Sequence, residues 1–72
     1  MSAMLAADYT DRTIEVLERL REVLERRHAQ SMLIADDETS DFGTRMHALG
    51  SARGFGVAID DITVAIQREQ GR

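Results

Sequence analysis

The sequence predicts an all-α protein: an antiparallel helical hairpin that dimerises into a four-helix bundle. The pentapeptide Glu-Val-Leu-Glu-Arg occurs at 15–19 and again at 22–26, and a seven-residue spacing is typical of helices that return one face to a neighbour. The 72-residue sequence contains no proline to interrupt a helix. It also lacks cysteine, so a small core that disulfides cannot reinforce favours self-association as the source of extra stability.

The first predicted element is a helix over about 8–35, capped by Asp8 or Thr10. Its apolar residues recur at helical spacing and form a stripe about half a helix wide: Ile14, Val16, Leu17, Leu20, Val23 and Leu24. A stripe of this width is typical of a helix in a bundle, whereas a two-stranded coiled coil has a narrower one.

An acidic turn is predicted at 36–41, where the sequence reads Asp-Asp-Glu-Thr-Ser-Asp. Thr39, Ser40 or Asp41 can cap the helix that follows. Short connections of this kind usually join antiparallel neighbours, so the turn predicts a hairpin within a single domain, 1–72.

The second half, 42–70, has more than one interpretation. One continuous helix accounts for an apolar series at alternating spacings of three and four: Phe42, Met46, Leu49, Ala52, Phe55 or Gly56, Ile59, Ile62 and Ile66. Four glycines make a continuous helix over this range less favourable, and a break near 50–56 would give three helices. The alternative is a C-terminal β-hairpin around Asp60-Asp61, because apolar residues also alternate there at period two. Helix is favoured, since an isolated two-stranded hairpin is marginally stable.

Two sets of residues are the candidates for self-association or partner binding. The first is the middle of the apolar stripe, namely Val16, Leu17, Leu20, Val23 and Leu24. The second lies outside the main apolar face of 42–70 and consists of Gly50, Gly54, Val57 and Val64. Small residues spaced by four let helix backbones approach closely. The simpler interpretation of these glycines is a corner between two short helices.

No catalytic, cofactor or metal site is predicted, and the chain is not expected to be an enzyme. Glu25-x-x-His28 resembles half of a di-iron helix motif, but the matching carboxylates are lacking. Arg27 and His28 interrupt the apolar stripe. Polar residues there can fix helix register, but the favoured interpretation is that the stripe has reached the exposed end of the bundle. Asp41-Phe42-Gly43 and Gly54-x-Gly56 lack the surrounding elements of a kinase or dinucleotide site.

The formal net charge of −4 argues against nucleic-acid binding, because the sequence contains no basic stripe. A helix-turn-helix over 44–68 would put Asp60 and Asp61 in its recognition helix, where they would repel phosphate. A small DNA-binding transcriptional regulator or antitoxin-like protein is nevertheless the alternative function.

The expected function is that of a non-enzymatic protein–protein interaction module, acting as a homodimer and binding a larger host or cognate protein. All nine basic residues are arginine and asparagine is absent, which indicates a GC-rich bacterial or phage genome. No run approaches the roughly 20 apolar residues of a membrane span, so a cytoplasmic location is expected.

Overall fold

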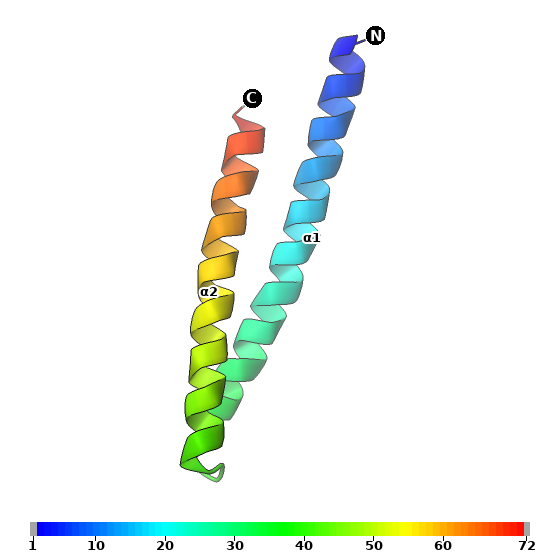
Figure 1. Cartoon of the computed structure of the whole chain (residues 1–72). Helices are drawn as coiled ribbons and strands as arrows, with labels where there is room; N and C mark the ends of the chain where they lie inside the picture. Colours follow the sequence, from blue (N-terminus) through cyan, green and yellow to red (C-terminus); the bar gives the residue numbers. More distant parts are fainter. Residues whose placement is uncertain (1, 72) are drawn as a thin grey trace.

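The computed structural model describes residues 2–71, and the side chains of residues 9–71. It contains helix α1 (Ser2–Asp36) and helix α2 (Phe42–Gln70), which fold back on each other as an antiparallel hairpin (Figure 1). The Cα atoms span 59 × 14 × 11 Å. No strand occurs within residues 2–71, so the all-α prediction is confirmed and the C-terminal β-hairpin is wrong.

The first helix begins earlier than predicted, at Ser2 and not near residue 8. Residues 3–7 are Ala-Met-Leu-Ala-Ala, which are among the strongest helix formers. They extend the helix upstream, so residues 8 and 10 lie inside it and do not cap it. The N-terminal end of α1 consequently projects beyond the end of α2 (Figure 1).

The second helix passes through residues 50–56 without a break, which makes the three-helix alternative wrong. Its glycines adopt no positive φ value, so they are ordinary helical residues here. Each costs about 1 kcal/mol relative to alanine. Burial of Ala48, Ala52 and Ile66 on the side facing α1 offsets that cost, because packing commonly outweighs intrinsic propensity.

The turn between the helices is held by the side chains of two aspartates. Asp37 Oδ1 accepts hydrogen bonds from the Thr39 amide at 2.9 Å and hydroxyl at 2.6 Å, and Oδ2 accepts one from the Ser40 hydroxyl at 3.2 Å. Asp41, one of the three predicted candidates, is the N-cap of α2 and accepts hydrogen bonds from the Thr44 amide at 2.7 Å and hydroxyl at 3.0 Å. Asp41 thus satisfies an amide that α2 leaves unpaired, whereas Asp37 holds the Thr39 amide within the turn itself.

These hydrogen bonds favour the ionised carboxylates and so lower both pKa values below the ordinary 3.8. For Asp37 the main cause is the Thr39 hydroxyl, and for Asp41 it is the Thr44 amide. A lowered pKa in the folded state stabilises the fold above the unfolded pKa, and that contribution is lost as the pH falls through the folded pKa. The turn is therefore expected to loosen only in acid, below about pH 4.

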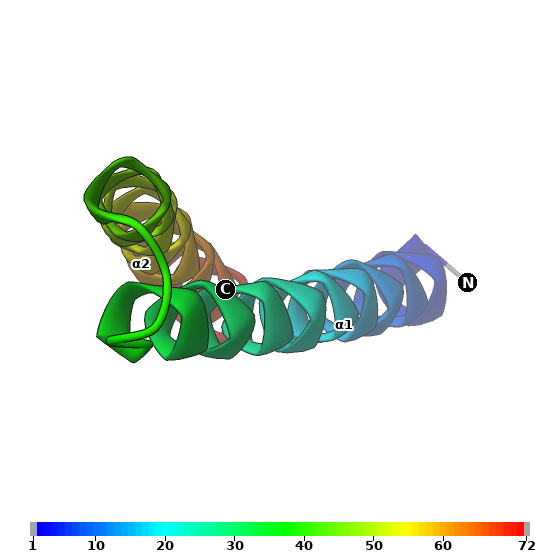
Figure 2. The ribbon, with the colours of Figure 1, turned by 90° about the horizontal axis from the view of Figure 1, so that it is seen from below.

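A second contact ties the start of α2 to the end of α1. Arg45 Nε donates a hydrogen bond to the Ala35 carbonyl oxygen at 3.0 Å. That carbonyl is one of the last four of α1, which have no partner within the helix. Seen from the turn (Figure 2), the helices leave this point at an angle and do not run strictly parallel.

Replacing Asp41 with alanine is expected to destabilise the protein by about 1 kcal/mol, because α2 loses its N-cap. Denaturant unfolding followed by circular dichroism at fixed protein concentration measures the change. Glu38→Ala is the matched control, since Glu38 is an exposed acid in the same turn. Equal effects of the two substitutions would contradict a capping role for Asp41.

Candidate interaction surface

The contact between the two helices is made mainly of small or half-buried side chains. Among residues 9–71, only Ala48, Ala52 and Ile66 are buried, and two of these are alanines. Leu17 and Leu24 of α1 are half-buried. The hairpin by itself therefore hides little apolar surface from water.

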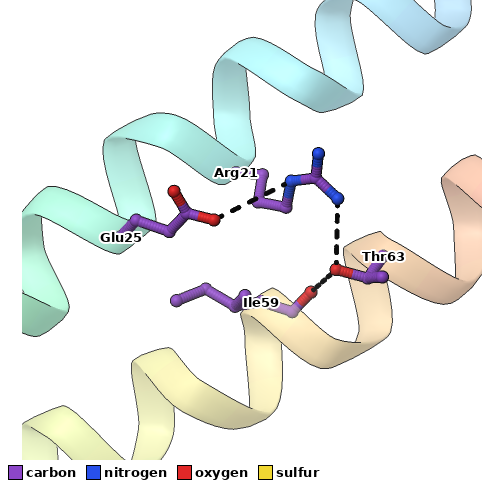
Figure 3. Close-up of polar contacts among 4 residues, drawn as sticks. All are labelled: Arg21, Glu25, Ile59 and Thr63. Atoms are coloured by element: carbon purple, nitrogen blue, oxygen red, sulfur yellow. Dashed lines mark hydrogen bonds and ion pairs between the residues drawn. The ribbon is translucent and has the colours of Figure 1, made fainter.

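One arginine lies within this contact (Figure 3). Arg21 Nη1 lies 3.4 Å from Thr63 Oγ1 across the hairpin, and Arg21 Nε lies 3.9 Å from Glu25 Oε1 on the same helix. The Thr63 hydroxyl donates in turn to the Ile59 carbonyl oxygen at 2.9 Å. The Arg21 side chain thus links α1 to α2 across the hairpin.

The sequence prediction did not include Arg21 among the interaction residues. Its spacing from Leu17 and Leu24 is four and three, which is the signal that could have placed it on the same face. His28 continues that series and is half-buried, whereas Arg27 is exposed. Of the two predicted polar interruptions, only His28 lies toward the contact.

The structure divides the predicted α1 stripe between two environments. Leu17, Val23 and Leu24 are half-buried. Val16 and Leu20 remain 64% and 47% exposed, because α2 covers only one side of a stripe that spans half the helix. An open hollow of about 330 Å³ lies along the uncovered part, lined by Tyr9, Arg12, Thr13, Val16 and Leu17.

The four predicted residues of α2 lie on the surface of the hairpin. Gly50 and Gly54 are exposed, and Val57 and Val64 are 63% and 44% exposed. A Cβ atom added at either glycine would meet no atom within 4 Å, so these glycines are not needed for the approach of α1. Their role in binding a partner stays a prediction.

The other sequence motifs occupy ordinary helical positions. The Glu25 carboxylate lies beside Arg21, and within the described chain no three His, Cys, Asp or Glu side chains gather as a metal site would require. A helix-turn-helix over 44–68 is excluded, because one uninterrupted helix covers that range. Over the described residues, neither helix has a stretch that is apolar enough to cross a membrane.

Comparisons with known protein families, curated proteins and solved structures find no match to this chain. The interpretation of its surface therefore rests on its own residues.

Replacing Arg21 with leucine is expected to stabilise the protein by about 1 kcal/mol, because a half-buried leucine gains more than a long hydrogen bond and a partly exposed ion pair contribute. Polar residues in helix contacts restrict register at a cost in stability, so the variant should also form a mixture of oligomers. Urea unfolding and light scattering test the two effects. Arg19→Leu, on an exposed position of the same helix, should not stabilise. A loss of stability in Arg21→Leu would contradict this account.

Proposed function

We propose that this protein is a non-enzymatic interaction module that works as a homodimer, with two hairpins packed into a four-helix bundle. In this proposal it is a small regulatory or adaptor protein in the bacterial cytoplasm, encoded by the bacterium or by a phage. The homodimer presents its remaining helical surface to a larger host or cognate protein.

The proposal rests on one observation: few apolar side chains are buried in the hairpin, and many large ones are exposed. Only three side chains among residues 9–71 are buried, whereas nine large hydrophobic ones are exposed: Tyr9, Val16, Leu20, Leu33, Ile34, Phe42, Met46, Val57 and Val64. Full burial of one valine, leucine or isoleucine contributes about 1.5–3 kcal/mol. A two-helix hairpin has no second layer to bury those of the α1 stripe, Val16 and Leu20, so dimerisation supplies that burial.

A second hairpin packed against the exposed part of the stripe would make the bundle that the width of the α1 stripe favours.

The outward set on α2, Gly50, Gly54, Val57 and Val64, is proposed as the place where a further protein binds. Its glycines carry no side chain that would hold an incoming helix away. This part of the proposal is separate from dimerisation, because it uses a different side of α2.

Replacing Leu20 with glutamate is expected to weaken dimerisation at least tenfold, because each subunit then places a carboxylate in an apolar interface. Sedimentation equilibrium measures the dissociation constant, and circular dichroism at the same concentrations follows the helix content. Leu33→Glu is the matched control, since Leu33 lies on α1 outside the apolar stripe and is 73% exposed. A Leu20→Glu protein that dimerises like the control would contradict the proposal.

A further inference from the structure

The turn end of the hairpin carries a second open hollow, which is called the turn hollow here. Its volume is about 220 Å³. It is lined by Ala35 and Asp36 from α1 and by Phe42, Arg45, Met46 and Leu49 from α2. None of these residues belongs to the apolar stripe of α1, so the turn hollow shares no residue with the surface proposed for dimerisation.

The apolar part of the turn hollow is open to a partner. Phe42 is 76% and Met46 48% exposed, whereas Ala35 and Leu49 are half-buried. Exposed apolar patches with a polar border are typical of protein-binding sites. A cavity of about 150 Å³ lined by apolar side chains accepts a benzene ring. The turn hollow therefore has room for one bulky apolar side chain.

The border of the turn hollow is strongly acidic. Asp36, Asp37, Glu38 and Asp41 lie in or beside the turn, and Arg45 is the only arginine or lysine between residues 31 and 49. Hydrogen bonds lower the pKa values of Asp37 and Asp41, so both are ionised at neutral pH. This charge attracts a basic partner and repels a phosphate-bearing one, such as a nucleic acid or an anionic membrane.

Met46 connects the turn hollow to the outward set on α2. It precedes Gly50 by four residues, and residues at that spacing are neighbours on one side of a helix. Gly50 is exposed, and a Cβ atom added to it would meet no atom within 4 Å. A segment bound in the turn hollow can therefore continue along the outward set.

We propose that the turn hollow binds a segment of a larger protein in which one bulky apolar side chain is flanked by lysines or arginines. The apolar side chain enters the hollow beside Phe42 and Met46, as a buried anchor does in other interfaces. The basic side chains lie near the carboxylates of the turn. This inference rests on the proposed function, since it names the chemistry of the host or cognate protein.

A peptide that contains tryptophan tests the proposal, because the protein has no tryptophan of its own. The probe is a short peptide with a single tryptophan flanked on both sides by lysines. Entry of the tryptophan into the turn hollow is expected to shift its emission to shorter wavelength, and titration of that shift gives the dissociation constant. The control peptide has glutamates in place of the lysines and should bind at least tenfold more weakly at low ionic strength. Equal binding of the two peptides would overturn the proposed chemistry.

Replacing Phe42 with aspartate is expected to weaken binding of the lysine peptide at least tenfold, because the turn hollow loses its most exposed apolar side chain. Leu33→Asp is the matched control. Leu33 is 73% exposed near the same end of the hairpin and does not line the turn hollow, and both substitutions add one negative charge. Circular dichroism follows the helix content of both variants. Equal affinity of the two variants for the peptide would overturn the turn hollow as the site.

The acidic border is tested by neutralising two carboxylates that make no hydrogen bond to the turn. Asp36→Asn combined with Glu38→Gln is expected to weaken binding of the lysine peptide at least threefold at low ionic strength, and added salt should reduce the difference. Asp60→Asn combined with Asp61→Asn removes the same charge farther along α2 and should have little effect. Equal weakening by the two double substitutions would overturn the role of the turn.

The outcomes separate this inference from the function on which it rests. Light scattering on the same samples gives the oligomeric state. A dimeric protein that produces no shift in the emission of the lysine peptide would overturn the inference and leave dimerisation standing. A monomeric protein that binds the peptide through Phe42 would overturn the proposed dimer and support the inference.

Discussion

Two helices that pack only against each other can bury a single stripe of each, and this constraint governs the whole structure. The apolar residues of α1 cover about half its circumference, but α2 covers only the part that contains Leu17 and Leu24. Two of the three buried residues of α2 are Ala48 and Ala52, which allow close approach but contribute little apolar area. The two helices therefore have a defined arrangement, but much of their apolar surface remains exposed.

The details of the hairpin restrict its geometry more than they stabilise it. Asp37 and Asp41 shape the turn through hydrogen bonds to exposed groups, and Arg45 ties the start of α2 to the end of α1. Arg21 and Thr63 link the two helices across the hairpin. Such contacts contribute modestly to the free energy of folding. In the proposed dimer, apolar burial between subunits supplies the main stabilisation.

The sequence predicted the hairpin well because its signals are local. The pentapeptide repeated after seven residues, the acidic turn and the Asp41 cap each involve residues that are close together in the sequence. The start of α1 was misplaced because Asp8 and Thr10 resemble caps, whereas the preceding alanines extend the helix. The sequence could not decide whether the glycines of α2 interrupt the helix. Burial of Ala48 and Ala52 depends on a partner helix that the local sequence does not reveal. Arg21 was missed for the same reason, because a contact across the hairpin decides its role.

The proposed folded unit is a dimer. Its most direct test is the molar mass of the wild-type protein, measured by light scattering across a hundredfold range of concentration, with thermal unfolding at each concentration. We expect twice the chain mass of 8.1 kDa and a melting temperature that rises with concentration, because association stabilises the fold. A folded species of 8.1 kDa with cooperative, concentration-independent unfolding would contradict it.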